Sequence, residues 1–182
     1  MPGVTVPSPI VHAFDQSDAF DMRDALFTAL APESGERILE VGAGSGCYAL
    51  EVAEEVGPGG TVDIVDGLPD RLEDAVRGAR ERGLDNLSPT LGDGRYLPFG
   101  DSWFDGAYMI AALGDVPDQP AALAELARVL RPGGRLAIGE LDGDPHRVDP
   151  DRLQASAAAA GLRIVRRIDR RGGYVALLAH DD

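Results

Sequence analysis

The sequence predicts a doubly wound α/β domain built on a mostly parallel sheet, and three observations lead to this fold class. Short apolar segments of strand length alternate with longer segments in which apolar residues recur at helical spacing. Glycine and proline clusters separate most of these segments. The 182 residues are enough for one domain with a sizeable core. Strands that alternate with helices build parallel sheets, so the alternation predicts the sheet type. The length predicts that residues 1–182 form a single domain.

The first elements follow from apolar spacing and from the residues that interrupt it. Apolar residues at helical spacing predict a helix over Phe20–Leu30, preceded by an N-terminal arm of residues 1–19. A short apolar strand, Arg37–Val41, then runs into a series of glycines. The next helix carries an apolar stripe up to Val56 and stops at the glycines and proline of residues 57–60.

The second strand is predicted over Thr61–Val65, with a well-bounded helix after it. Pro69 lies near the start of that helix and Gly83 just past its end, which are the positions these residues favour. Leu87–Leu91 is predicted as a third strand. Pro89 has no amide hydrogen for a neighbouring strand, so this strand is expected at an edge of the sheet.

The remaining elements continue the alternation up to a terminal hairpin. The fourth strand is predicted over Phe104–Ile110, followed by a helix over Ala121–Leu130 and a fifth strand over Arg135–Gly139. Asp149 can cap a helix whose first residue is Pro150 and which ends at Gly161. The last two segments should pair as an antiparallel hairpin across a Gly-Gly turn. They are Leu162–Ile168 and Tyr174–Ala179.

Charge and composition limit the partners. The formal net charge of −14 gives a field that repels phosphate backbones and anionic lipid surfaces, so neither nucleic acid nor membrane is expected. The dense arginine run between Arg163 and Arg171 is interpreted as a solvated strand face and loop. No apolar run approaches the roughly 20 residues of a membrane helix, and no secretory signal is visible. We therefore expect a cytoplasmic protein, either a monomer or a homodimer.

Two residue types limit the chemistry. The chain contains no lysine, so Schiff-base and amine-nucleophile chemistry have no residue to carry them. Cys47 is the only cysteine, which excludes an intrachain disulfide and a cysteine-rich zinc site, and no metal is expected. Cys47 itself is expected either as a small packing residue or as a thiol activated by the start of a helix.

Candidate ligand-binding residues follow the first two strands. In the segment EVGAGSG, residues 40–46, the glycines allow a tight turn and let a ligand approach the backbone at a helix N-terminus. Asp66 stands about twenty residues later, at the end of the second strand, where a carboxylate can accept hydrogen bonds from ribose hydroxyls. A turn or capping role for Asp66 is the alternative. A dinucleotide dehydrogenase shares both features.

Four ordered motifs give the chain a family resemblance. ILEVGAGSG resembles the first motif of the class I S-adenosylmethionine-dependent methyltransferases, and TVDIVDGLPDRL resembles their second-strand motif. GDGRYLPFGDSWFDGAYMI resembles their segment from an adenine-contacting aspartate into the fourth strand, and LARVLRPGGRLAI resembles the helix, turn and fifth strand that follow. The resemblance is to the small-molecule group that includes the ubiquinone and menaquinone biosynthesis enzymes. It implies a Rossmann-like seven-stranded sheet, mostly parallel with an antiparallel last strand.

The resemblance implies S-adenosylmethionine as cofactor, S-adenosylhomocysteine as product, and a role for each matched residue. Glu40 would hold the cofactor's amino group, or alternatively satisfy backbone donors of the loop. Asp66 would bind the ribose, and Leu68 would pack on the adenine. Asp93 would accept from the adenine amino group, with a plain Asp-Gly turn as its alternative. Met109, Ile110 and Ala111 would border the methionine end, although their apolar character equally suits the core. The full implied set is Glu40, Gly42, Ala43, Gly44, Gly46, Asp66, Gly67, Leu68, Asp93, Gly94, Met109, Ile110 and Ala111.

The resemblance further implies methyl transfer to a small-molecule acceptor. A sulfonium methyl group is already activated, so in-line displacement mainly requires positioning and exclusion of water. A base is needed only for an acceptor that loses a proton, and His12, Asp115 and His146 are the candidates, each of them alternatively an ordinary surface or loop residue. Asp115 stands where the family often has histidine. The N-terminal arm is expected either to be partly disordered or to cover the cofactor.

One alternative from another functional class remains. The missing histidine, and the lack of a long insertion between the fifth strand and the last helix, suit a cofactor-binding protein that acts as a non-catalytic partner or regulatory subunit. No Asn-Pro-Pro-Tyr-like stretch ends the fourth strand, which argues against methylation of nucleobase or glutamine amines and favours a small-molecule acceptor.

Overall fold

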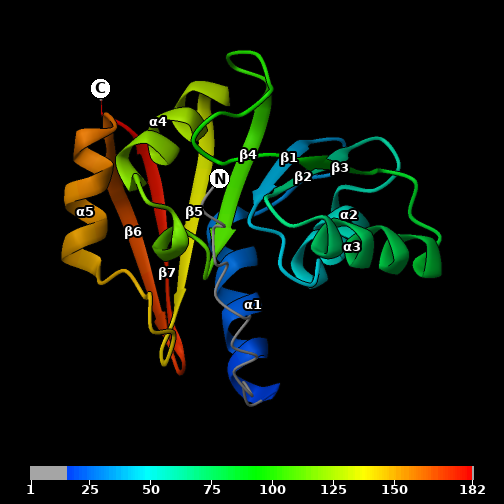
Figure 1. Ribbon diagram of the computed structural model, residues 1–182, viewed down its shortest axis with the longest axis horizontal. Helices are drawn as coiled ribbons and strands as arrows, with labels where there is room; N and C mark the ends of the chain where they lie inside the picture. The colour runs from blue at the N-terminus through cyan, green and yellow to red at the C-terminus, as the bar shows by residue number, and fades with distance from the viewer. Residues whose placement is uncertain (1–15, 182) are drawn as a thin grey trace, which may run out of the picture.

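A seven-stranded sheet forms the centre of the computed structural model, which describes residues 16–181 and the side chains from residue 21 onward (Figure 1). The strand order is β3-β2-β1-β4-β5-β7-β6. Strands β1 to β5 pair in parallel, and β7 is antiparallel to both β5 and β6. The strands are β1 (Arg37–Val41), β2 (Thr61–Asp66), β3 (Leu87–Leu91), β4 (Phe104–Ile110), β5 (Leu130–Leu141), β6 (Leu162–Arg170) and β7 (Gly173–His180). The predicted fold class and the edge position of β3 are confirmed.

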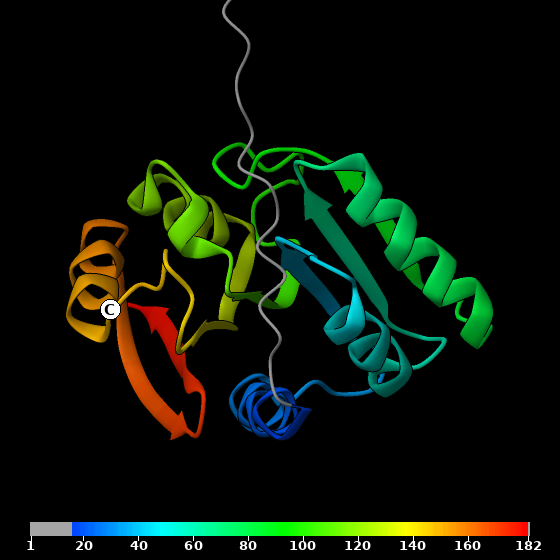
Figure 2. The same cartoon turned by 60° about the horizontal axis from the view of Figure 1, so that its bottom comes forward.

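Helices cover both faces of this sheet (Figure 2). Helices α1, α2 and α3 bury their apolar residues against one face, together with Ile38, Ile64 and Tyr108. Helices α4 and α5 do so against the other face, together with Leu39 and Met109. The helical elements are α1 (Gln16–Leu30), α2 (Cys47–Val56), α3 (Pro69–Arg82), the 3₁₀ turn η1 (Leu113–Asp115), α4 (Gln119–Val129) and α5 (Pro150–Ala159). Neighbouring residues of one strand therefore point into different cores.

The residues that predicted the start of helix α5 form its N-terminal cap. The Asp149 side chain accepts a hydrogen bond from the Arg152 amide at 3.0 Å, and Pro150 occupies the first turn of α5. Gly161 follows the helix with a left-handed φ of 72°. The predicted start of α5 is confirmed, and the helix ends at Ala159, two residues before the predicted Gly161.

Two predicted boundaries were wrong by four or five residues. Helix α1 begins at Gln16, because its polar first turn carries no apolar periodicity that a pattern could detect. Strand β5 begins at Leu130, which pairs with Phe104 before the register shifts and Arg135 pairs with Gly106. Residues 131–134 form the resulting irregularity, and their proline and glycines resemble an ordinary turn in the sequence.

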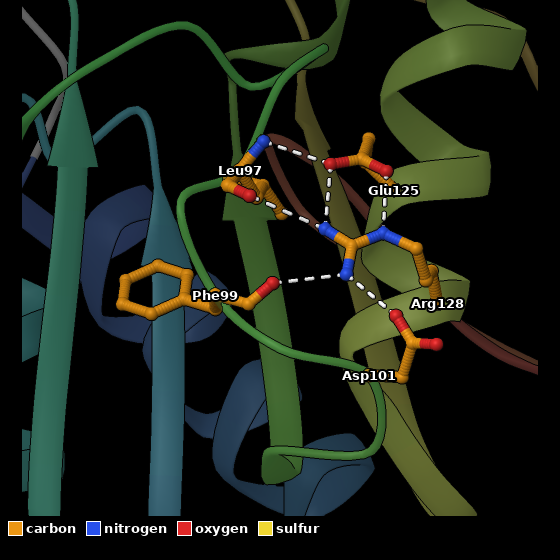
Figure 3. Close-up of polar contacts among 5 residues, drawn as sticks. All are labelled: Leu97, Phe99, Asp101, Glu125 and Arg128. Atoms are coloured by element: carbon orange, nitrogen blue, oxygen red, sulfur yellow. Dashed lines mark hydrogen bonds and ion pairs between the residues drawn. The ribbon is translucent and has the colours of Figure 1, made fainter.

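Arg128 on α4 holds the segment between β3 and β4 in place (Figure 3). Its Nη1 donates to the carbonyl of Phe99 at 2.9 Å and to Asp101 at 2.8 Å, and its Nη2 donates to the carbonyl of Leu97 at 3.2 Å. Glu125 accepts from the same guanidinium and from the Leu97 amide at 2.8 Å. One half-buried arginine therefore satisfies backbone groups that would otherwise need water.

Replacing Arg128 with leucine is expected to lower the free energy of unfolding by about 2 kcal/mol, because the Leu97 and Phe99 carbonyls lose their donors. Urea denaturation measures this loss. Arg77→Leu is the matched control, since Arg77 forms only an exposed surface pair with Asp74, a kind worth at most about 1 kcal/mol. Equal losses in the two variants would contradict the role given to Arg128.

No helix between residues 16 and 181 combines the length and the apolar character needed to cross a bilayer.

Candidate functional site

The glycine loop after β1 contains three left-handed glycines with different surroundings. Gly42, Gly44 and Gly46 have φ values of 82°, 54° and 76°. A Cβ on Gly42 would overlap the Ala112 side chain, and a Cβ on Gly46 would lie 2.5 Å from that of Ala75. Around Gly44, no described atom lies within 4 Å of the place a Cβ would take. Two glycines therefore permit close packing, and Gly44 faces open space that a ligand can enter.

Helix α2 begins at this loop with an uncapped N-terminus. Gly46 occupies the cap position without a side-chain hydrogen bond, and the first turn contains no acidic residue. The amides of the first two helical residues and the positive end of the helix dipole favour a negatively charged ligand group. Ala43 is buried in the core beneath the loop, so its side chain is unavailable to such a ligand.

Glu40, the next-to-last residue of β1, is buried with an unsatisfied carboxyl oxygen. Its side chain is 1% exposed, and Oε2 has no hydrogen-bond partner among the described residues. Burial raises the pKa of Glu40 well above its usual range, and the charge of Asp66 adds to the rise. The Tyr108 hydroxyl, on the neighbouring residue of β4, and the Ala49 amide lower that pKa only in part. A buried oxygen without a partner is costly, and a ligand donor would remove that cost.

Asp66 ends β2 with one oxygen fixed and one free. Its Oδ1 accepts from the Leu68 amide at 2.9 Å, whereas no hydrogen bond from residues 21–181 reaches Oδ2. Its carbonyl accepts from the Gly92 amide at 3.0 Å, which brings the loops after β2 and β3 together. Gly67 and Leu68 are both exposed beside it. The turn geometry and a free acceptor oxygen thus coexist at Asp66.

Asp93 is engaged by Arg95. Its Oδ1 accepts from the Arg95 amide at 2.9 Å, and its Oδ2 lies 2.6 Å from the Arg95 guanidinium, which lowers the pKa of Asp93. Asp93 therefore adopts the Asp-Gly turn that the sequence analysis gave as the alternative to adenine binding. The following Gly94 packs on β1, because a Cβ there would lie 2.8 Å from Val41. The Asp93 loop and the glycine loop are thus neighbours.

The end of β4 contributes backbone more than side chains. Met109 and Ile110 are 1% and 8% exposed and belong to the two cores, so the core alternative accounts for their side chains. Ala111 is half-buried and has a left-handed φ of 48°, a conformation that costs a non-glycine residue energy. The next residue, Ala112, packs on Gly42. A strained turn therefore borders the glycine loop.

Two of the three candidate bases come together. The Nδ1 of His146, in the loop after β5, lies 2.5 Å from Oδ1 of Asp115, at the end of η1. The third candidate, His12, lies outside the described residues. Cys47, at the start of α2, is exposed, so its predicted packing role was wrong. The pKa of its thiol is raised by partial desolvation and then by Glu40 nearby, so activation by the helix is absent as well.

Glu140 is a buried carboxylate that the sequence analysis missed. It is 1% exposed, its Oε2 accepts from the Val148 amide at 3.0 Å, and its Oε1 has no partner among the described residues. The Tyr174 hydroxyl donates to the Val148 carbonyl at 2.7 Å, so the loop after β5 is held from two sides. A signal was present, because Glu40 and Glu140 are each the single carboxylate of their strand and each precedes an apolar residue at the strand's end.

Burial raises the pKa of Glu140 from 4.5 to about 7, so the folded protein binds this proton more tightly than the unfolded chain does. The resulting stabilisation is complete below about pH 4.5 and is lost as the pH rises through about 7. Glu140→Gln should abolish a loss of about 3 kcal/mol between pH 5 and pH 8, measured by urea denaturation at both values. The exposed Glu81→Gln variant should keep the wild-type difference, and an unchanged difference in Glu140→Gln would refute this assignment.

The sheet, the glycine loop and the carboxylate that ends β2 define a Rossmann-like domain of the kind that binds nucleoside-bearing ligands at the carboxyl ends of its strands. Residues 38–134, just over half of the chain, match the family model described as a methyltransferase domain. The chain belongs to the class I S-adenosylmethionine-dependent methyltransferase family. The match favours this family over the dinucleotide dehydrogenases.

Known relatives and a solved structure show the same likeness. The nocamycin O-methyltransferase of Saccharothrix syringae is 42% identical over 115 residues, which are 62% of this chain and 40% of that protein. The ubiquinone/menaquinone biosynthesis C-methyltransferase UbiE of Paracoccus denitrificans is 36% identical over 124 residues, 68% of this chain and 49% of that protein. The chain thus spans less than half the length of these two curated relatives. A crystal structure of a SAM-dependent methyltransferase from Aquifex aeolicus shares the fold, with a TM-score of 0.76, 21% identity, and coverage of 91% of this chain and 98% of that one.

Proposed function

We propose that this chain binds S-adenosylmethionine where β1, β2 and β4 end, and transfers the methyl group to a small molecule. The observation that carries the proposal is the buried, unpartnered oxygen of Glu40 directly before a glycine loop that faces open space. A carboxylate there suits an ammonium group, which can donate the missing hydrogen bond. The uncapped start of α2 suits the carboxylate of the same amino acid.

The other matched residues would hold the nucleoside. The free Oδ2 of Asp66 would accept from a ribose hydroxyl, and the exposed Leu68 would pack on the adenine. Asp93 can accept from the adenine amino group only by sharing an oxygen with Arg95 or by releasing it. The Gly94 backbone is the alternative contact at that end. Gly44 and Ala111 would border the methionine portion.

The chain's own contribution is positioning. When bound, the sulfonium cofactor supplies an activated methyl group. Glu40 and Asp66 would fix the two ends of the cofactor, so that its methyl group faces the loops after β4 and β5. In-line displacement then requires an acceptor held close to that group, with water excluded.

The acceptor is proposed to be a small molecule. The relatives carry names of small-molecule methyltransferases, among them the nocamycin and ubiquinone/menaquinone enzymes. The net charge of −14 opposes a nucleic-acid acceptor. The alternative function, a non-catalytic S-adenosylmethionine-binding partner or regulatory protein, predicts the same cofactor affinity without turnover.

Formation of S-adenosylhomocysteine separates the two functions. The full chain is incubated with S-adenosylmethionine and a panel of phenols, enols and carboxylic acids, and products are measured by mass spectrometry. We expect S-adenosylhomocysteine together with a methylated acceptor, and much less of both with Glu40→Gln. Cofactor binding without S-adenosylhomocysteine from any acceptor would overturn methyl transfer and leave the binding-protein alternative.

A further inference from the structure

The Asp115–His146 pair has a defined polarity. Because Asp115 lies 2.5 Å from Nδ1 of His146, its carboxylate holds the ring proton on that nitrogen. In the tautomer that this contact favours, the lone pair is on Nε2, and no described side chain within residues 21–181 hydrogen-bonds to Nε2. Both side chains are more than half exposed, at 54% for His146 and 65% for Asp115. Nε2 can therefore accept a proton from a molecule that approaches from solvent.

The loop that carries His146 is fixed on both sides. The His146 amide donates to Asp144 at 2.8 Å, and two residues later Val148 is held by Glu140 and Tyr174. The His146 backbone also packs against Gly114 so closely that any Cβ there would overlap the His146 carbonyl. The backbone that carries the imidazole is therefore tightly packed, which positions the side chain for proton transfer.

The pair also lies at the edge of the sheet where the cofactor would bind. Asp115 is three residues beyond Ala112, which packs on Gly42 of the glycine loop, and β4 and β5 are adjacent parallel strands. The loops that follow these two strands therefore flank the end of the site bordered by Ala111. An acceptor placed between that end and His146 would meet the cofactor on one side and Nε2 on the other.

We propose that His146 is the general base of the reaction, that Asp115 is its positioning residue, and that the acceptor is a phenol or enol hydroxyl. This inference rests on the proposed function. In the reaction the acceptor O–H proton passes to Nε2 while the oxygen forms a bond to the methyl carbon. The carbon–sulfur bond breaks and its electron pair stays on sulfur, giving S-adenosylhomocysteine. The imidazolium then releases its proton to solvent.

The acidity of the acceptor follows from the base. A histidine base suits an acceptor hydroxyl that is still protonated at neutral pH but acidic enough to lose its proton during the reaction, as in phenols and enols. An alcohol is far less acidic, and a carboxylic acid is already ionised at neutral pH and needs no base.

Phenols of different acidity provide the test. The probes are 4-methylphenol, which is protonated at neutral pH, 4-nitrophenol, which is ionised at mildly alkaline pH, and a cyclic 1,3-diketone in its enol form. His146→Gln should lower kcat for 4-methylphenol about 100-fold or more, the size of a general-base contribution. It should lower kcat far less for ionised 4-nitrophenol, which has no proton to lose. His180→Gln, a change of an exposed histidine at the end of β7, should match wild type.

A positioning role for Asp115 has its own signature. Asp115→Asn should lower kcat for 4-methylphenol about tenfold and leave kcat for ionised 4-nitrophenol nearly unchanged, because the imidazole loses the carboxylate that holds its ring proton on Nδ1. The affinity for S-adenosylmethionine, measured by calorimetry, should stay unchanged in all three variants, which also verifies that they fold. A purely structural role for Asp115 would lower kcat for both phenols alike.

Three outcomes would overturn the proposal, and they are distinguishable. Wild type that binds S-adenosylmethionine but methylates none of the three probes refutes the acceptor class. His146→Gln that equals His180→Gln with 4-methylphenol, or that loses equally with both phenols, refutes the base. Failure of wild type to bind S-adenosylmethionine at all refutes the proposed function first, and the base with it.

Discussion

Glu40→Gln should lower the affinity for S-adenosylmethionine about 100-fold, close to 3 kcal/mol, and should leave the cofactor-free protein more stable than wild type at pH 8. The affinity falls because a neutral amide cannot pair with the cofactor's ammonium group as the buried carboxylate can. The stability rises because the unfolded chain ionises Glu40 at pH 8, whereas the folded protein must either keep its proton or bury the charge beside an unpartnered oxygen, and both are costly. The two effects have opposite signs, as expected of a residue retained for binding.

The pH dependence of the same residue has a definite sign. Burial raises the pKa of Glu40, so the folded protein binds this proton more tightly than the unfolded chain. Its contribution to stability is complete below the unfolded pKa and is lost as the pH rises through the raised folded pKa. Cofactor affinity should follow the opposite trend, because the ammonium pairs with the ionised carboxylate and binding should release a proton.

Calorimetry in buffers with different ionisation enthalpies measures affinity and proton release together, and urea denaturation measures stability. The control is Glu81→Gln, a change of an exposed glutamate on α3 that should alter neither quantity. If Glu40→Gln binds the cofactor as wild type does, or is less stable than wild type at both pH 5 and pH 8, the role given to this carboxylate is wrong.

Gly46→Ala should lower the free energy of unfolding by about 4 kcal/mol, the largest stability effect we expect for the glycine loop. A φ of 76° costs an alanine about 1–2 kcal/mol. The new Cβ would also lie 2.5 Å from the Ala75 Cβ and 2.9 Å from its Cα, and overpacking against a fixed backbone adds about 1–3 kcal/mol. Gly83→Ala is the control, with a φ of 68° and no described atom within 4 Å, and should cost only the backbone strain.

Gly44→Ala should reverse this pattern. Its φ of 54° causes about the same backbone strain as in the control. No overpacking is added, because its Cβ would meet no described atom within 4 Å. The added methyl group would enter the space proposed for the cofactor, so the affinity for S-adenosylmethionine should fall while stability resembles that of Gly83→Ala. Thermal denaturation with and without cofactor measures both. Unchanged cofactor binding in Gly44→Ala would mean that the ligand lies elsewhere.

Elements with an unambiguous local pattern were predicted closely. Strands β1, β3 and β4 have the predicted limits, because each is a short run bounded by glycine, proline or polar residues. The edge position of β3 followed from Pro89 alone. The irregular start of β5 was missed, because it depends on pairing with Phe104, which the local sequence does not contain.

The candidate site was also predictable only where it depends on local sequence. The left-handed glycines and the position of Asp66 at the end of β2 could be predicted, because both depend on a local turn. The ion pair between Arg95 and Asp93 could not be predicted from the Asp-Gly pair, since it depends on the conformation of the Arg95 side chain. The meeting of Asp115 with His146 joins residues 31 positions apart and depends on the packing of Gly114 against the loop after β5.

The most direct test of the central claim is a calorimetric titration of the full chain with S-adenosylmethionine, S-adenosylhomocysteine and NAD. The account predicts binding of both sulfur compounds at a single site and no binding of NAD. Binding of NAD, or of none of the three, would contradict it.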